Sequence, residues 1–219
     1  MLNCYQLCLP KISNRLQIDL LKYARSLEPE AGWPPNKFWD FSGEEHLYHQ
    51  FHEQTKTGKS VYLQYLLPDD LKNRIQEEMT DALFPFSQVN WYLQLISGGQ
   101  RLMPHRDPGR NLSILYNLVP DTATTHFYTT TNTHPTRHIY AMNEVKEIEN
   151  IQMKPYTWYS MNNKTIHAVS KMTTLRVAIS SNISYFHPEL ELPDHDTFCR
   201  RYPDLLVTSG LAGRNRTCI

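Results

Sequence analysis

The sequence has no long apolar run and no excess of charge of either sign. Within its 219 residues, no stretch approaches the roughly 20 consecutive apolar residues that span a bilayer. Lys and Arg together number 22, and Asp and Glu also number 22, so the formal net charge is zero. Such a balance offers no general electrostatic attraction to nucleic acids or anionic membranes. We therefore expect neither kind of partner.

The chain has few cysteines, and they lie near its two ends. They are Cys4, Cys8, Cys199 and Cys218, without the paired spacing of a metal site. We expect the thiols to be reduced, as in a reducing compartment. A disulfide between the terminal segments is the alternative. The first residues also lack the charged-then-apolar layout of a secretory signal. We therefore expect a cytoplasmic protein.

Amphipathic spacing predicts helices in the N-terminal part of the chain, residues 1–87. Residues 14–27 and 69–84 place apolar side chains three or four positions apart, which defines one face of a helix. Ser42-Gly43-Glu44-Glu45 matches a capping box and predicts the start of another helix. Residues 60–66 are predicted as a strand. We expect these helices to cover one face of a sheet.

From residue 88 onward, short β-branched and aromatic runs are broken by Gly, Pro, Asn and Asp, a pattern typical of a sandwich or barrel. The predicted strands lie near residues 89–96, 101–105, 112–119, 124–130, 136–141, 146–153, 156–161, 166–170 and 174–185. They favour a mainly β fold with added helices: a double-stranded β-helix, or jelly roll, with N-terminal helices packed outside its larger sheet. We expect one domain, with the jelly-roll core at 88–186 and a tail at 187–219 that becomes helical near 196–202.

One histidine triplet stands out as a metal-ligand motif. His105-Arg106-Asp107 is the one His-x-Asp sequence among ten histidines. Residues i and i+2 of an extended segment point to the same side, so His105 and Asp107 can bind one metal ion together. His167 then supplies a third ligand from a distant strand. Three protein ligands leave open positions opposite, as in non-haem Fe(II) oxygenases, whereas structural zinc closes its shell.

The surroundings of this triplet resemble the Fe(II)/2-oxoglutarate-dependent dioxygenases, most nearly the prolyl-hydroxylase-like and aspartyl/asparaginyl-hydroxylase-like branches. As in those families, a strand at 90–96 and the turn Ser97-Gly98-Gly99 lead into the triplet, and a strand at 112–118 follows. The distal His and an Arg come later, in the segments 166–169 and 175–180. The resemblance covers residues 88–186.

By this resemblance, Arg176 binds the distal carboxylate of the cosubstrate 2-oxoglutarate. A charge inside the apolar run 175–179 is costly unless a carboxylate meets it, and a planar guanidinium binds a carboxylate through two hydrogen bonds. A structural salt bridge is the alternative for Arg176. Tyr116 is expected either to donate to the same carboxylate or to pack in the core. Gln94 is a weaker candidate for cosubstrate binding.

The other histidines fit a metal site less well. In His187-Pro188-Glu189 a proline separates the two possible ligands, so packing of the tail is the expectation. His46, His49 and His52 share helical spacing, which a solvated or packed helix face explains. Three further histidines fall in predicted strands or turns and are candidates for lining a substrate cavity: His126, His134 and His138.

The resemblance implies an oxygenase that uses Fe(II) with 2-oxoglutarate and O2 as cosubstrates. Such an enzyme releases succinate and CO2 while it oxidises, most often hydroxylates, an unactivated C–H bond. A compact chain without a recognition module suits a small-molecule substrate such as an amino acid. A protein or peptide side chain fits the same resemblance. The alternative from another class is a non-catalytic jelly-roll binding protein that retains a metal.

Overall fold

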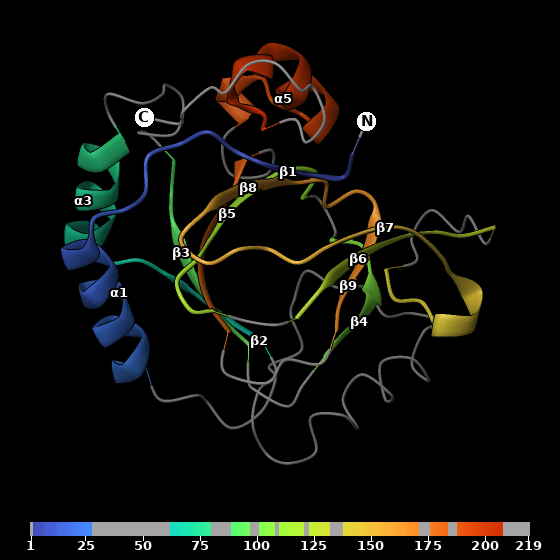
Figure 1. Cartoon of the computed structure of the whole chain (residues 1–219), viewed down its shortest axis with the longest axis horizontal. Coiled ribbons are helices and arrows are strands. Elements are labelled where there is room, and N and C mark those ends of the chain that lie inside the picture. Colours follow the sequence, from blue (N-terminus) through green and yellow to red (C-terminus); the bar gives the residue numbers. More distant parts are fainter. Residues whose placement is uncertain are drawn as a thin grey trace.

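The computed structural model describes residues 2–27, 62–79, 89–96, 101–107, 110–120, 123–131, 138–170, 176–183 and 188–207. Their strands form two antiparallel sheets that face each other (Figure 1). The larger sheet contains, in spatial order, β1 (Cys4–Gln6), β8 (Trp158–Met161), β5 (Ser113–Asn117), β10 (Arg176–Asn182), β3 (Tyr92–Ile96) and β2 (Tyr62–Leu66). The smaller sheet contains β4 (Leu102–His105), β9 (Ile166–Val169), β6 (Thr125–Thr129) and β7 (Lys146–Ile151).

The strands from β3 to β10 follow one another in a regular pairing scheme. The first, β3, pairs with the last, β10; β4 then pairs with β9, β5 with β8, and β6 with β7, all antiparallel. The chain therefore runs as one long hairpin, rolled so that its strand pairs alternate between the two sheets. This is the strand order of a jelly roll, and the predicted fold class is confirmed.

Two helices cover the outer face of the larger sheet (Figure 1). Helix α1 (Asn14–Ser26) begins where the Ser13 side chain accepts a hydrogen bond from the Leu16 N–H. It buries residues spaced four apart, Leu16, Leu20 and Ala24. Helix α3 (Asp69–Met79) does the same with Leu71, Ile75 and Met79. These apolar faces pack on the sheet in the main hydrophobic core, as the amphipathic spacing predicts.

Cross-strand pairing sorts the side chains of the larger sheet onto two faces, because neighbours along a strand point to opposite sides. The face toward the helices carries Ile114, Tyr116, Trp158, Val177 and Ile179. The opposite face carries Leu115, Tyr159 and Met161, which form a hydrophobic cluster with Phe127 of the smaller sheet. We call this second face, turned toward the smaller sheet, the inner face.

The N-terminal segment forms an edge strand that the sequence did not predict. Strand β1 pairs with β8, and Leu7 then makes a bridge to Leu206. Cys4 and Cys199 are buried and free, but Cys8 is disulfide-bonded. The expectation of reduced thiols is therefore wrong for Cys8. The segment around Cys8 is hydrogen-bonded to residues 205–207, so the two terminal segments lie side by side, and cysteine type and spacing alone do not reveal that pairing.

The strand predicted at 136–141 does not form in the part of it that the structure describes, residues 138–141. Ile139 makes only an isolated bridge, to His105, and the 3-10 helix η2 (Met142–Glu144) follows. The Glu144 carboxylate accepts from the Ala141 N–H, which turns the chain out of the extended conformation. The helix expected after the capping box at 42–45 lies outside the described residues. None of the helices described is long and apolar enough to cross a membrane.

Helix α5 (His195–Arg201) confirms the helix predicted in the tail and packs beside β8 and β1 (Figure 1). The Asp194 carboxylate caps its first turn by accepting from the Thr197 N–H. His195 is fully buried, stacks on Tyr5, and places Nε2 3.1 Å from the Ser160 Oγ on β8. Burial lowers the pKa of His195 to about 4, so the imidazole is neutral at neutral pH.

This neutral histidine should make stability depend on pH. In the unfolded chain the pKa returns to near 6.5, so the unfolded state binds more protons between these values and stability is lost as pH falls from 6.5 toward 4. At pH 4 the loss from His195 is about 3 kcal/mol. Urea unfolding at pH 7 and pH 4 should therefore show a smaller pH dependence in His195→Gln than in wild type. An identical dependence in both proteins would contradict this role.

Candidate metal centre

His105 and His167 lie opposite each other on neighbouring strands of the smaller sheet. His105 ends β4, His167 lies in β9, and the two residues are cross-strand partners. Phe127 of β6 pairs with His167 from the other side and contacts the larger sheet, so both imidazoles belong to the inner side of the roll. Their ring centroids are 4.3 Å apart, and both residues are buried. The fold thus brings together two histidines that are far apart in sequence.

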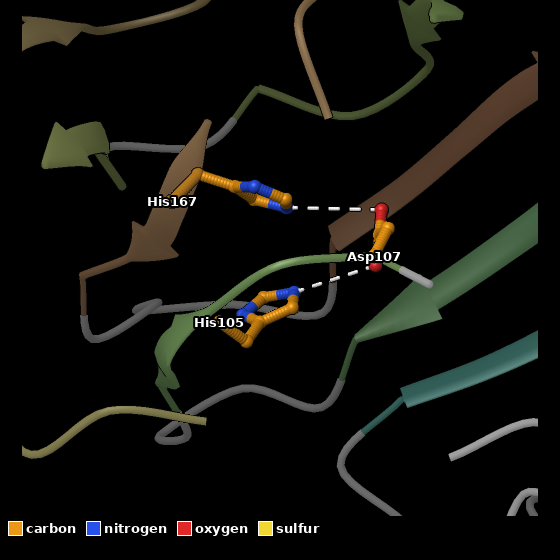
Figure 2. Close-up of side chains that lie close together, drawn as sticks. All are labelled: His105, Asp107 and His167. Carbon is orange, nitrogen blue, oxygen red and sulfur yellow. Dashed lines mark ion pairs between the residues drawn. The ribbon is translucent and has the colours of Figure 1, made fainter. Parts of the chain in front are cut away.

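Asp107 completes a group of three possible ligands, and Figure 2 shows its carboxylate facing both imidazoles. Its Oδ1 lies 3.7 Å from His105 Nε2, and its Oδ2 lies 3.8 Å from His167 Nε2. One ligand atom from each residue lies within 4.8 Å of the others. Such separations suit a single metal ion between them, since metal bonds to imidazole nitrogen and carboxylate oxygen are each about 2.0–2.2 Å.

Both histidines have their other ring nitrogen placed against a backbone carbonyl. His105 Nδ1 lies 2.7 Å from Met103 O, and His167 Nδ1 lies 3.0 Å from Thr165 O. A carbonyl only accepts, so each Nδ1 carries the proton and each Nε2 presents a lone pair toward Asp107. Metal-binding histidines are typically oriented in this way. The arrangement therefore fits a metal better than a buried charge pair, which would use Nε2–H donors.

The protonation states also suit metal binding. Burial, together with the nearby His167, lowers the pKa of His105 to about 4, so His105 is neutral at neutral pH. Burial opposes ionisation of Asp107, but the charge of Arg110 and the adjacent polar groups outweigh it and hold its pKa well below its usual range. Arg110 Nη2 donates to Asp107 Oδ1 at 2.9 Å. His105 thus offers a neutral nitrogen donor, and Asp107 offers a carboxylate, beside the imidazole of His167.

Arg176 is placed on the facing sheet with its side chain on the inner face. It is the first residue of β10, and Ala178, two positions on, pairs with Asn117 on the same face. Arg176 is buried, with Nη2 3.4 Å from Asn117 Oδ1 and 3.5 Å from Met153 Sδ. Its burial on the inner face makes the Arg176 guanidinium a candidate for binding a carboxylate.

Polar residues accompany Arg176 along the inner face. Gln94 pairs with Ala178 and is half-buried on that face. Ser180 lies four residues after Arg176, is fully buried, and its Oγ has no hydrogen-bond partner. A buried hydroxyl at this place is able to hydrogen-bond a polar ligand. Ser180 was not predicted, although the two-residue alternation of a strand that starts at Arg176 would have placed it on this face.

Tyr116 lies on the other face of the larger sheet. Its ring packs against Trp158, and its hydroxyl accepts from Gln17 Nε2 of α1 at 3.3 Å. Burial raises the pKa of Tyr116 to about 12. The expectation that Tyr116 binds the cosubstrate is therefore corrected, and the alternative of core packing describes its position. The reason is strand alternation: Asn117, the next residue, has the inward position.

Replacing Tyr116 tests this correction. Tyr116→Phe should leave the 2-oxoglutarate dissociation constant unchanged and lower the free energy of unfolding by about 1 kcal/mol, the net contribution of one buried hydrogen bond. Isothermal titration with 2-oxoglutarate and urea unfolding of the same sample would measure both quantities. A large rise in the 2-oxoglutarate dissociation constant without loss of stability would show that Tyr116 does contribute to cosubstrate binding.

The remaining histidines fall into two groups. His126 Nδ1 lies 2.8 Å from Glu147 Oε2 on the partly exposed β6–β7 pair, which describes a surface ion pair. His138 is partly buried, and its backbone O accepts from the Arg106 N–H. The others named from the sequence lie outside the described residues: His46, His49, His52, His134 and His187.

No family model matches the chain, and no curated protein matches its sequence. Among solved structures, it is similar to the non-heme alpha ketoglutarate dependent epimerase SnoN from nogalamycin biosynthesis, with 12% identity over 81% of this chain and 76% of that chain and a TM-score of 0.46. It is also similar to E. coli ycfD, with 11% identity over 71% of this chain and 42% of that chain and a TM-score of 0.40.

A third similar structure is procruciferin, an 11S globulin from Brassica napus, with 9% identity over 56% of this chain and 25% of that chain and a TM-score of 0.32. The chain thus spans less than half the length of ycfD and procruciferin. TM-scores this low carry no inference about activity. The strand order establishes the jelly roll, and His105, Asp107 and His167 form a group that could hold a metal ion.

Proposed function

We propose that this chain is an Fe(II)- and 2-oxoglutarate-dependent oxygenase that hydroxylates a C–H bond of a small molecule. One observation carries the proposal: His105, Asp107 and His167 bring three ligand atoms together on one side of the roll, while buried Arg176 lies on the inner face of the opposite sheet. Two imidazoles and one carboxylate with open positions are the ligand set of non-haem Fe(II) oxygenases. When bound, iron and 2-oxoglutarate supply the oxidising power.

The chain's own groups then have distinct tasks. The three ligands hold the metal on the smaller sheet, and their Nδ1–carbonyl contacts fix the two imidazole rings. Arg176 would bind the far carboxylate of 2-oxoglutarate through its guanidinium fork. Ser180, whose hydroxyl lies on the same face, would be a hydrogen-bonding group for the substrate. Gln94 is retained as a weaker candidate.

A small polar substrate is the proposal that the inner face supports best. Besides the apolar cluster around Phe127, that face carries buried polar side chains able to hydrogen-bond amino or carboxyl groups: Ser113, Asn117, Ser180 and Asn182. Their burial suits a ligand enclosed between the sheets. The amino and carboxyl groups of an amino acid match the polarity of these side chains.

The test is a metabolite screen with the unmutated protein. Protein, Fe(II) and 2-oxoglutarate are incubated in air with a metabolite pool, and succinate and new masses are followed by mass spectrometry. The expected result is succinate release coupled to a small product that gains one oxygen atom. Hydroxylation of peptides alone would favour a protein side-chain hydroxylase. Metal binding without succinate from any pool would favour the non-catalytic binding protein.

A further inference from the structure

The carboxylate of Asp107 is held by a residue from the turn between β8 and β9. Asn163 Nδ2 donates to Asp107 Oδ2 at 2.6 Å, and the Asp107 N–H donates to Asn163 O at 3.4 Å. Asn163 therefore contacts both the side chain and the backbone of Asp107. It is only 2% exposed, so water does not compete for these contacts.

Asn163 also links parts of the metal centre that come from different strands. It lies four residues before His167, at the start of the connection into β9, whereas Asp107 follows β4. Because the hydrogen bond joins these two segments, the position of the carboxylate is coupled to the strand that carries His167. Asp107 could not be fixed in this way by its own segment alone.

The second oxygen of the same carboxylate has a competing partner. Arg110 Nη2 donates to Asp107 Oδ1 at 2.9 Å from a position three residues along the chain. Guanidinium and carboxylate groups favour a bidentate arrangement, in which both oxygens face the arginine. Here Asn163 occupies Oδ2, so the ion pair uses one oxygen and the carboxylate stays between the two imidazoles.

We propose that Asn163 is a positioning residue of the metal centre, which prevents Asp107 from rotating into a bidentate ion pair with Arg110. The inference rests on the proposed function, because it assigns Asn163 a role toward the same metal. Loss of the Nδ2 donor frees Oδ2, and rotation toward Arg110 then withdraws the carboxylate from the histidine nitrogens. Removing a hydrogen-bond partner behind a metal ligand typically weakens metal binding ~10–100-fold.

The test uses Co(II), whose binding and visible absorption can be measured without turnover. In Asn163→Ser, which suits a turn, the Co(II) dissociation constant should rise ~10–100-fold. The absorption spectrum at saturating Co(II) should also change, because the carboxylate coordinates differently. Adding Arg110→Met should raise the Co(II) affinity of this variant by a larger factor than it raises that of wild type, because only the variant has lost the donor that competes with Arg110, an effect that a purely structural defect would not show.

The matched control is Asn162→Ser in the same turn, since Asn162 Nδ2 bonds to Asn3 and not to Asp107. It should bind Co(II) like wild type. Asn163→Ala serves if Asn163→Ser does not fold, which urea unfolding of the metal-free proteins would show. Co(II) affinity and spectrum equal to wild type in the folded Asn163 variant, or no larger gain from Arg110→Met than in wild type, would overturn this inference alone. Failure of wild type to bind Co(II) would overturn the metal centre as well.

Discussion

His105→Ala and His167→Ala should each abolish Fe(II) binding and turnover. The two imidazoles supply two of the three ligand atoms, so each variant keeps only one imidazole and one carboxylate. The affinity loss should exceed the ~10–100-fold that removal of a residue behind a ligand causes. Anaerobic titration of metal-free protein with Fe(II) would measure it, with one ion per chain expected for wild type.

A histidine outside the centre provides the matched control. His126→Ala removes a partly exposed imidazole that pairs with Glu147 on the β6–β7 surface. It should bind Fe(II) as wild type does, because His126 belongs to neither the inner face nor the ligand group. If both His105→Ala and His167→Ala fold and still bind Fe(II) normally, the metal centre is refuted. The group would then be a buried hydrogen-bonded charge cluster.

Arg176→Lys should weaken 2-oxoglutarate binding strongly while leaving metal affinity unchanged. Lysine keeps the positive charge but lacks the planar fork that makes two hydrogen bonds to one carboxylate. The loss should correspond to about one charge-assisted hydrogen bond, about 1.5–3 kcal/mol. Titration of the Fe(II)-loaded protein with 2-oxoglutarate, under anaerobic conditions, would measure the change in dissociation constant.

The control is Arg74→Lys, which changes an arginine of α3 that pairs with Asp19 on the outer side of the molecule. It should bind 2-oxoglutarate like wild type. The same titration can assign Arg176 to a structural role. In that case Arg176→Lys would lower the free energy of unfolding but leave the 2-oxoglutarate dissociation constant where it was.

Much of the fold follows from short-range patterns in the sequence. Apolar residues spaced four apart predict α1 and α3, and β-branched and aromatic runs between turn residues predict the strands of the roll. These patterns succeed because each helix or strand buries one face. Strand β1 was not predicted because it has only three residues, too few to show an alternating pattern. It is extended because it pairs with β8.

The sequence also determined which residues were candidates for the metal centre, since His105 and Asp107 share a side of one extended segment. Only the tertiary structure decided the rest. Cross-strand register places His167 opposite His105, and strand alternation turns Tyr116 toward the helices and Arg176 toward the smaller sheet. No local pattern marks Asn163 as a partner of Asp107, because that contact joins a turn and a strand end that meet only when the roll closes.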